Sequence, residues 1–368
     1  MKGRRPRPLD DGDSGEVRVS GHLSWAKPIQ NKRVFCLMQS ATITFMSIVS
    51  NCTASVIKDA ANSLINGNLV AFPTETVYGL GADATNKAAV ARIYEVKGRP
   101  SDHPLIVHIS SIELLDKWAS EIPEYAINLA RQFWPGPMTL VLPRTSIAKD
   151  FITGGQDTVA IRVPSHILAN QLLREFESLG GYGVAAPSAN RFGKVSPTNA
   201  DAVEEEIGKF LLESDQILDG GQSQIGIEST IIDCTGDTPR VLRPGSVTLE
   251  MIESLLKQKL VYLESSSREI KTSGSFETHY SPNAHVILNG TTNPGYGFIA
   301  LNEIPTPIGA IRLASPKDDE DYARVLYSAL RLADSRGIKT VNVIPPINQG
   351  IGLAIDNRLK KASKGEQI

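Results

Sequence analysis

The sequence has few cysteines and no long apolar run. Its 368 residues include three cysteines, Cys36, Cys52 and Cys234, and no two of them form a CxxC pair. An odd, scattered set of this kind is not a disulfide scaffold and favours a reducing compartment. No apolar run approaches the roughly 20 residues that a membrane-spanning helix needs. We therefore expect a cytoplasmic protein without a membrane partner.

Common catalytic signatures are also absent. The sequence has neither a GxxxxGKS/T phosphate loop nor a GxSxG nucleophile motif, and internal repeats are not apparent. His103 and His108 lie five residues apart in a segment expected to be extended, which places their side chains on opposite faces, so no shared metal is predicted. With 38 Lys and Arg against 40 Asp and Glu, the net charge of -2 would confine any RNA contact to a local patch.

Length and composition predict four parts. A chain of 368 residues that is 41% hydrophobic suits two ordinary domains better than one. Residues 1–50 mix arginines and aspartates with glycine and serine, so we expect a disordered, non-catalytic arm, with Met46 as an alternative start. Residues 51–260 are expected to form the first domain, 261–283 a polar linker or lid, and 284–368 a small C-terminal domain.

Residues 68–109 carry the densest signals. The apolar run 69–72 predicts a strand, and the polar turn 74–76 follows it, where open α/β proteins place their ligand chemistry. Helical spacing over 86–97 begins at Asn86, a reasonable N-cap, and ends at the sequence KGRP, which supplies a cation, a glycine and a proline. Residues 105–109 predict the next strand. Two hydroxyls and two fixed cations are thus directed toward one region.

The other elements are short strands and amphipathic helices. In the first domain helices are expected at 55–66, 111–120, 123–133, 166–179, 201–208 and 249–256, and strands at 138–142, 158–163, 183–186, 228–233 and 240–242. Short, hairpin-like links predict a mixed α/β sheet. In the C-terminal domain, strands at 298–301, 309–313 and 340–344 and a helix at 321–336 predict a small Rossmann-like unit without a nucleotide fingerprint.

Taken singly, the polar residues also permit structural roles. Lys97 and Arg99 could offset the dipole at a helix end, and His108 could be a strand histidine bonded to backbone. Arg162 lies in an apolar strand, where an unpaired guanidinium would be costly, so it needs a carboxylate partner. Together, however, the cations, hydroxyls and amides suit the binding of polyanions and carboxylates. They fit a reaction in which the substrates supply both nucleophile and leaving group.

Several motifs jointly resemble the YrdC/Sua5 family, the threonylcarbamoyl-AMP synthases. They are PTETVYGLG from Pro73, KGRPSDHPLIVH from Lys97, PSAN at 187–190, GIEST at 226–230 and RPG at 243–245. The resemblance covers roughly residues 55–258. It implies a YrdC-like twisted mixed open sheet with helices, plus the small Rossmann-like C-terminal domain of the long, Sua5-type members. That domain looks short for the long form.

The resemblance also implies an activity. The family makes L-threonylcarbamoyladenylate from L-threonine, bicarbonate and ATP, releases pyrophosphate, and so feeds the t6A modification of tRNA. The expected partners are these substrates, a downstream threonylcarbamoyl transferase complex, and tRNA or double-stranded RNA. Mg²⁺ is expected to arrive on the ATP, because no carboxylate cage is visible in the core motifs and no metal ligand is predicted.

Site residues follow from the motifs. Lys97 and Arg99 match the catalytic cations. The threonine pocket is implied for Thr76, His108, Arg162 and Ser229. The nucleotide contacts are implied for Lys97, Arg99, His103, Thr158, Ser188, Asn190, Ser196, Arg243 and Tyr280. His103 stands where the family often has asparagine, and Tyr280 belongs to the HYSP motif of the expected lid.

Two other functions compete with this one. A double-stranded RNA or tRNA-binding module could use the same basic concave surface, although the near-neutral charge and the lack of interleaved aromatics count against it. Carbamoyl transfer to another acceptor, as in hydrogenase maturation proteins that contain a YrdC-like domain, is disfavoured because acylphosphatase and zinc-finger segments are missing.

Overall fold

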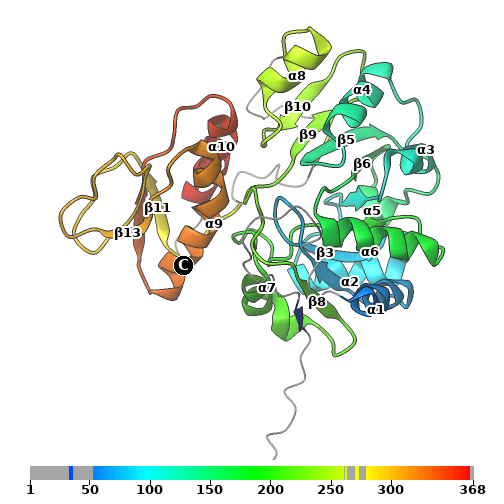
Figure 1. The fold of residues 1–368 in the computed structure, drawn as a ribbon, viewed down its shortest axis with the longest axis horizontal. Coiled ribbons are helices and arrows are strands. Elements are labelled where there is room, and N and C mark those ends of the chain that lie inside the picture. The colour runs from blue at the N-terminus through cyan, green and yellow to red at the C-terminus, as the bar shows by residue number, and fades with distance from the viewer. Residues whose placement is uncertain (1–32, 36–52, 261, 263–269, 273–278, 365–368) are drawn as a thin grey trace, which may run out of the picture. The chain divides into compact units, whose positions relative to one another are not determined.

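Two separate sheets organise the chain (Figure 1). The structure, a computed structural model, describes residues 33–35, 53–260, 262, 270–272 and 279–364. The first sheet is mixed and ten-stranded, and the second is parallel and four-stranded. The predicted fold class, a mixed α/β sheet with a small second α/β domain, is therefore confirmed.

The first sheet has the strand order β1-β8-β2-β3-β7-β4-β6-β5-β9-β10. Its strands are β1 (Arg33–Phe35), β8 (Gln216–Asp219), β2 (Val70–Phe72), β3 (Gly79–Asp83), β7 (Val184–Ala185), β4 (Ile106–His108), β6 (Thr158–Arg162), β5 (Met138–Pro143), β9 (Thr230–Asp233) and β10 (Arg240–Arg243). The sheet contains parallel pairs, such as β4 with β6, and antiparallel pairs, such as β2 with β3. This arrangement brings the ends of β2, β4, β6 and β7 close to one another.

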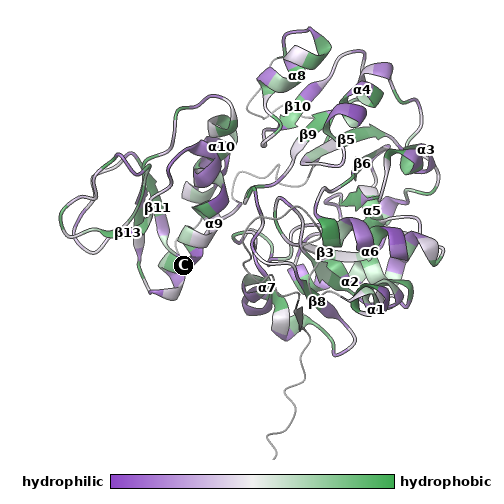
Figure 2. Ribbon diagram, in the orientation of Figure 1, coloured by the Kyte–Doolittle hydropathy of each residue, from purple (hydrophilic) through white to green (hydrophobic). Residues whose placement is uncertain are grey.

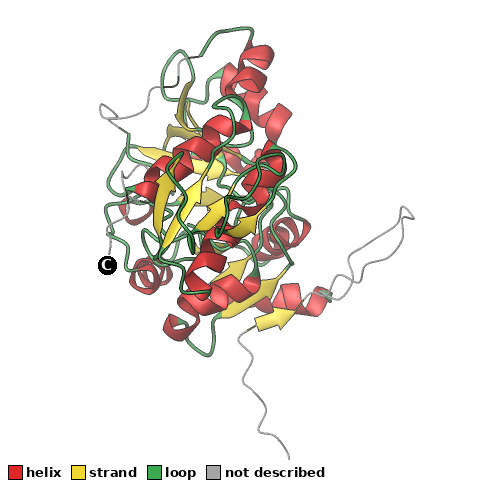
Figure 3. Cartoon of the chain, turned by 90° about the vertical axis from the view of Figure 1, so that its left-hand side faces the viewer, coloured by secondary structure: helices red, strands yellow, loops and turns green. Residues whose placement is uncertain are grey.

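Both faces of this sheet are buried. Leu69 and Ala71 belong to one apolar cluster, whereas Val70 and Phe72 belong to another, as the two-residue period of a strand requires. The helices that cover the sheet are α1 (Ala54–Ile65), α2 (Lys87–Lys97), α3 (Leu115–Trp118), α4 (Glu124–Phe133), α5 (Asp150–Thr153), α6 (Ile167–Ser178), α7 (Ala200–Ile207) and α8 (Leu249–Leu256), with the short 3-10 helices η1 (Ile112–Leu114) and η2 (Gly208–Phe210). Figure 3 shows helices on both sides of the strands.

The helices are amphipathic. In α6 the residues Leu168, Leu172 and Phe176 recur at helical spacing and are buried. Figure 2 shows the corresponding mixture of hydrophilic and hydrophobic positions along α6. None of the helices in the described ranges is both long and apolar enough to cross a membrane.

The C-terminal sheet has the order β11-β14-β12-β13. Its elements are β11 (His285–Leu288), β12 (Gly297–Ile299), β13 (Ile311–Ala314), α9 (Asp319–Ser335), β14 (Thr340–Val343) and α10 (Ile351–Ser363). The predicted strands and the long helix are present within a few residues. β11 and α10 were not predicted, and neither were β3, β8 and α5 in the first domain.

Two expectations about the less regular segments need comment. The arm 1–50 was expected to be disordered, but Arg33–Phe35 forms β1, which pairs in parallel with β8. The rest of that arm lies outside the described residues. Of the expected linker or lid, 261, 263–269 and 273–278 also lie outside them. The described remainder includes His279 and Tyr280, whose side chains are buried.

Candidate functional site

A small closed cavity brings most of the predicted site residues together. Its wall includes Thr76, Arg99, His108, Arg162, Ser188, Ser229, Arg243 and Tyr280, which come from the two expected halves of the site. Its volume is about 40 Å³, room for very few water molecules. Pockets that hold drug-sized ligands span several hundred Å³. The structure therefore describes a closed arrangement of the site.

The polar turn after β2 forms one wall. Thr74 closes the turn, because its Oγ1 donates to the Val77 carbonyl at 2.6 Å and accepts from the Thr76 N–H at 3.2 Å. The Thr76 hydroxyl is 2.8 Å from the Thr74 hydroxyl and faces Arg162. Thr74 thus shapes the turn, and both Thr74 and Thr76 line the cavity.

Arg162 is held by three groups. Its guanidinium donates to Glu75 Oε1 at 2.6 Å, to Thr76 Oγ1 at 2.9 Å and to the Gly136 carbonyl at 3.3 Å. Glu75 is fixed in turn, because its second oxygen accepts from the Ser165 N–H at 3.1 Å. The carboxylate partner that Arg162 requires is therefore a protein residue. These bonds engage three of the five N–H groups of the guanidinium, so donors remain for a substrate carboxylate.

His108 lies beside Arg162 at the end of β4. The two residues are register partners on the paired strands β4 and β6. Burial, and next the charge of Arg162, lower the pKa of His108 to about 3. The imidazole is consequently neutral at working pH and lines the cavity as a polar, uncharged group.

The two cations after α2 have different surroundings. Lys97 Nζ donates to the carbonyls of Ser188 and Asn190, both at 2.6 Å, so the ammonium binds the PSAN turn rather than the end of its own helix. Offsetting the helix dipole does not account for that position. Arg99 is buried, donates to the Pro104 carbonyl at 2.9 Å and lines the cavity. Gly98, between them, has φ of 61°, which allows the chain to turn there.

Burial also affects the acidity of these cations. Burial, and next the charge of Arg99, hold the pKa of Lys97 well below its usual value. Burial lowers the pKa of Arg99 to about 10. Folding has already removed most of the water from these two cations. Binding an anion therefore costs them less desolvation free energy than it would cost a solvent-exposed cation. This is the electrostatic character expected of a phosphate site.

Arg243 and Ser229 lie together at another part of the wall. Arg243 Nη2 donates to Ser229 Oγ at 3.1 Å, and Arg243 Nε donates to the Ser229 carbonyl at 3.0 Å. Ser229 Oγ is also 2.8 Å from Thr139 Oγ1. The predicted threonine residue Ser229 and the predicted nucleotide residue Arg243 are therefore direct neighbours.

Other predicted residues do not line the cavity. Asn190 braces its own loop, since its Nδ2 donates to the carbonyls of Arg191 and Lys194. Ser196 is buried and donates to Glu228 Oε1 at 2.6 Å. Thr158 stands at the opposite end of β6 from Arg162, roughly 13 Å away at the rise of a strand.

His103 is likewise absent from the cavity wall. It is buried and packs against the Phe192 ring, with centroids 5.3 Å apart. The nucleotide contacts predicted for His103, Thr158, Asn190 and Ser196 stay predictions.

Three residues that were not predicted belong to the site. Glu75 orients Arg162, while Glu228 and His279 line the cavity. Glu75 lies in the PTET motif and Glu228 lies in the GIEST motif. An acidic residue among small and apolar residues was the sequence signal that could have identified both. Burial, far ahead of the nearby charges, lowers the pKa of His279 to about 3.

The described residues offer no protein-bound metal centre. No three His, Cys, Asp or Glu side chains among them gather as a metal site. Glu228 in the cavity wall and Glu75 behind Arg162 each accept a hydrogen bond from an arginine. This donor set fits a metal carried by a polyphosphate better than one held by the protein.

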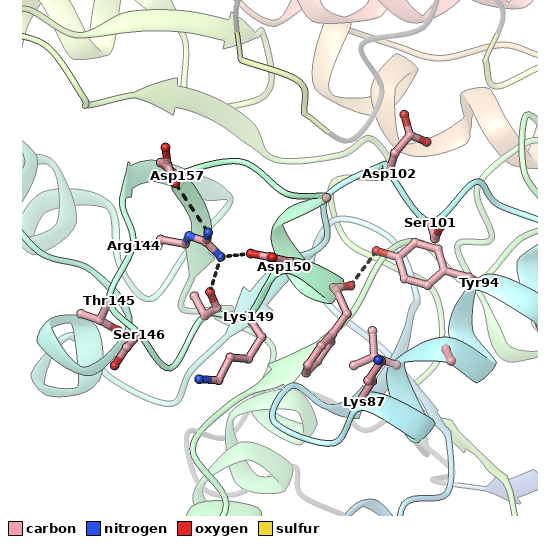
Figure 4. Close-up of a pocket in the computed structure, with 15 residues that line it drawn as sticks. Lys87, Tyr94, Ser101, Asp102, Arg144, Thr145, Ser146, Lys149, Asp150 and Asp157 are labelled. Atoms are coloured by element: carbon pink, nitrogen blue, oxygen red, sulfur yellow. Dashed lines mark hydrogen bonds and ion pairs between the residues drawn. The ribbon is translucent and has the colours of Figure 1, made fainter.

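A second hollow is larger and more open. It has a volume of about 1210 Å³ and lies between α2 and the segment that follows β5 (Figure 4). Arg144 pairs there with Asp150 at 2.7 Å and Asp157 at 3.5 Å, and Tyr94 donates to the Phe151 carbonyl at 3.2 Å. None of the predicted site residues lines this hollow. The smaller cavity is therefore the candidate site.

Comparisons with known proteins cover almost all of the described chain. A family model described as "Telomere recombination" matches residues 62–245. A model described as "Threonylcarbamoyl-AMP synthase, C-terminal domain" matches residues 247–364. The C-terminal domain is thus of the expected type.

Curated relatives agree along most of their length. The threonylcarbamoyl-AMP synthase of Pyrococcus abyssi is 42% identical over 86% of this chain and 98% of its own. The Bacillus subtilis enzyme of the same name is 39% identical over 85% of this chain and 94% of its own. The expectation that the C-terminal domain is short was wrong, because these relatives are covered almost completely.

A solved structure supports the same assignment. The crystal structure of P. abyssi Sua5 complexed with L-threonine has a TM-score of 0.75 and 39% identity, and covers 84% of this chain and 95% of that one. The motifs, the fold and these comparisons agree from the first domain to the last helix. The chain belongs to the Sua5-type family of threonylcarbamoyl-AMP synthases.

Proposed function

We propose that this protein synthesises L-threonylcarbamoyladenylate from L-threonine, bicarbonate and ATP, with release of pyrophosphate, for the t6A modification of tRNA. Relatives named threonylcarbamoyl-AMP synthase support this function, as does the L-threonine complex of the P. abyssi protein. One observation carries the proposal at the level of the site. Arg162, aligned by Glu75, shares one closed cavity with Arg99 and Arg243.

The two ends of the cavity suit two different anions. Arg162, Thr76 and neutral His108 form a polar end that matches the carboxylate and hydroxyl of an amino acid. Arg99 and Arg243 are planar, bidentate donors that match phosphate oxygens. The site therefore positions an amino acid and a nucleotide next to each other, which accounts for a large part of catalysis in reactions between two substrates.

The chemistry needs no protein nucleophile. The amine of threonine takes up CO2 derived from bicarbonate and becomes a carbamate. One carbamate oxygen then attacks the α-phosphorus of ATP, a new P–O bond forms, and the bond to pyrophosphate breaks. Arg99 and Arg243 stabilise the charge that develops on the phosphate oxygens. Exclusion of water from the site once the substrates are bound would protect both the carbamate and the mixed anhydride.

Lys97 and Ser188 position the PSAN turn at the cavity wall. The ammonium of Lys97 binds the Ser188 carbonyl, and Ser188 lines the cavity at the same turn. The turn consequently carries a fixed positive charge close to the phosphates. Mg²⁺, when bound with ATP, would neutralise phosphate charge as well, held by the phosphates rather than by a protein cage.

The surroundings of the reaction follow from the product. A labile adenylate must pass to a transferase that acts on tRNA, so a threonylcarbamoyl transferase complex is the proposed downstream partner. We place the reaction in the cytoplasm, where the substrates ATP and tRNA are found. Direct binding of tRNA by this chain is a separate question.

The competing function of RNA binding is less well supported by the site. Arg99, Arg162 and Arg243 are all buried, so an RNA backbone cannot reach them in this arrangement. Salt separates the two functions. Binding of double-stranded RNA through phosphates should weaken steeply between 50 and 200 mM salt, by about 1000-fold or more for several contacts. Threonine-dependent release of pyrophosphate should change little over that range.

The direct test measures the products. Purified full-length protein is incubated with ATP, L-threonine and ¹³C-bicarbonate, and the adenylate is sought by mass spectrometry. We expect a labelled threonylcarbamoyl adenylate, together with pyrophosphate that requires both threonine and bicarbonate. Equal release of pyrophosphate with either substrate left out would overturn the proposal.

A further inference from the structure

Glu228 is a buried carboxylate that the reaction scheme does not use. It lies in the GIEST motif between β8 and β9 and lines the cavity. Its side chain is only 8% exposed. A buried carboxylate is costly unless charged and polar groups compensate it. The compensating groups come from far along the sequence.

The C-terminal domain supplies two of them. Tyr327 on α9 donates to Glu228 Oε2 at 2.9 Å, and Arg358 Nε on α10 donates to the same oxygen at 3.0 Å. The other oxygen accepts from Ser196 at 2.6 Å. Arg358 also donates to the Pro244 carbonyl at 2.7 Å, beside Arg243. The carboxylate thus joins the C-terminal domain to the predicted nucleotide residue Ser196, and Arg358 also binds the backbone next to Arg243.

The same two residues contact Tyr280. The Tyr280 ring stacks on the Tyr327 ring, with centroids 5.8 Å apart and planes 22° apart. The Arg358 guanidinium lies 5.5 Å from the centroid of the Tyr280 ring. Tyr280 has φ of 63°, a left-handed conformation that is unfavourable for a tyrosine. Such a conformation persists when its surroundings enforce it, and these contacts do so here.

We propose that Arg358 and Tyr327 are positioning residues for the nucleotide half of the active site, acting through Glu228. Arg358 and Tyr327 hold the Glu228 carboxylate in place, and Glu228 in turn orients Ser196. Arg358 and Tyr327 also hold the Tyr280 ring against the cavity. The inference rests on the proposed function and extends it, because it makes the C-terminal domain a part of the site. Neither residue touches substrate in this scheme.

The charge of Glu228 supports this arrangement. Burial alone would raise the pKa of Glu228, but the charges of Arg358 and Arg243 lower it to about 2. The carboxylate is therefore ionised at working pH and accepts from all three of its donors. The threonine half of the cavity has its own carboxylate, Glu75, which does not contact the C-terminal residues named here. The two carboxylates can consequently be disturbed separately.

Two variants test the proposal in the full-length protein. Tyr327→Phe removes one hydroxyl and keeps the ring, whereas Arg358→Gln removes the charge that faces Glu228. Lys360→Gln is the matched control, because it removes a positive charge from the same helix at a residue that pairs with Asp356. For each protein we would measure the KM for ATP, the Kd of a non-hydrolysable ATP analogue, the Kd of L-threonine, and thermal unfolding.

The expected results differ between the two ligands. Tyr327→Phe should weaken binding of ATP and its analogue about tenfold, the effect of losing one hydrogen bond to a charged group. Arg358→Gln should weaken it about 100-fold. The Kd of L-threonine should change less than about twofold in Tyr327→Phe, and Lys360→Gln should match the wild type.

Several outcomes would overturn the inference. Equal loss of threonine and nucleotide binding in Tyr327→Phe would indicate a general structural function, and unchanged nucleotide binding would indicate no positioning at all. If Arg358→Gln fails to fold, the nucleotide and threonine affinities of Tyr327→Phe still test the inference. Measuring the Kd of the analogue requires no turnover. Failure of the inference can therefore be distinguished from failure of the proposed reaction. If the proposed reaction is wrong, the wild-type protein will bind nucleotide but make no adenylate.

Discussion

Glu75 binds Arg162 in the cavity wall and Glu228 binds Arg358 on α10, and neither acid was predicted as a site residue from the sequence. Both lie within recognised motifs, but their partners are far away: Glu75 is 87 residues from Arg162, and Glu228 is 130 residues from Arg358. No local spacing encodes such pairs. The strand order brings the first pair together, and the docking of α10 brings the second pair together. Sequence reasoning could predict that Arg162 needs a carboxylate, but not which one.

Glu75→Gln tests the first pair. Glutamine keeps the shape of the side chain but removes the charge that aligns Arg162, so we expect the KM for L-threonine to rise about tenfold or more. The KM for ATP should change little, because Glu75 contacts Arg162 and the Ser165 N–H rather than the phosphate end. Steady-state kinetics with each substrate varied in turn make the measurement. An effect confined to ATP would contradict this assignment.

Lys97→Met tests the cation behind the PSAN turn. Methionine fills similar volume but cannot donate to the carbonyls of Ser188 and Asn190, so turnover should fall about 100-fold and stability by about 2 kcal/mol. Pyrophosphate release and urea unfolding would be measured together. Lys87→Met, at the exposed start of the same helix, should leave both unchanged. If Lys97→Met keeps full turnover, Lys97 is a structural residue only.

At the scale of elements, α2 shows where sequence signals suffice. Asn86 was predicted as the N-cap, and its side chain accepts from the N–H groups of Ala88 and Ala89. Gly98 was predicted to end the helix, and it has the left-handed conformation of a C-cap. Both ends depend on local chemistry that a few residues encode. The prediction therefore succeeded to within a residue.

The missed elements lack such local signals. β3 is the sequence GLGAD, in which two glycines conceal a strand, and Gly81 is required there because a Cβ would lie 2.8 Å from Phe72 and Val184. Helix α10 contains the buried polar residues Asp356 and Arg358, which spoil its apolar stripe. The burial of Arg358 becomes intelligible only with Glu228 in place. Tertiary partners decided these elements, and pattern alone did not reveal them.

Gly98→Ala measures how much the α2 end contributes. An added Cβ would lie 2.6 Å from the Arg191 guanidinium, which donates to the Val96 carbonyl, and alanine is unfavourable at φ of 61°. We expect a loss of about 2 kcal/mol in the free energy of unfolding and a clear fall in turnover, since Gly98 separates Lys97 from Arg99. Chemical denaturation and pyrophosphate release give the two readouts.

Gly180 provides the matched control for that experiment. It also has positive φ, at 97°, but nothing lies within 4 Å of an added Cβ. Gly180→Ala should therefore cost about 1 kcal/mol from backbone strain alone and leave turnover intact. Equal costs at the two positions would show that the contact with Arg191 is unimportant.

At the scale of the molecule, the two sheets are joined by polar contacts around one cavity. Arg331 on α9 pairs with Glu206 on α7 at 3.2 Å, and Arg358 pairs with Glu228. The sequence predicted two domains and a polar connection between them, and the resemblance to a known family supplied the site. What could not be foreseen is that the second domain, which was assigned no chemistry, binds Glu228 in the cavity wall with buried side chains.

The closed cavity also predicts how the whole protein responds to acid. His108 and His279 are buried, and burial lowers the pKa of each to about 3. In the unfolded chain a histidine binds a proton near pH 6.5, so between pH 6.5 and 3 the unfolded state holds more protons than the folded one. Stability is therefore complete above pH 6.5 and is lost as the pH falls. At pH 5 the loss is about 2 kcal/mol for each histidine.

Urea unfolding of the wild type at pH 7, 6 and 5 would measure this slope. Glu228 acts at lower pH, because its pKa of about 2 in the folded protein makes its contribution fall only below about pH 4.5. The histidines should therefore dominate between pH 6.5 and 5. His108→Gln should remove part of the slope in that window, whatever it does to stability at pH 7, because burial lowers the pKa of His103 and His166 as well. A variant with both histidines replaced that kept the wild-type slope would show that other groups hold the protons, and that these rings are not the buried neutral residues of the cavity.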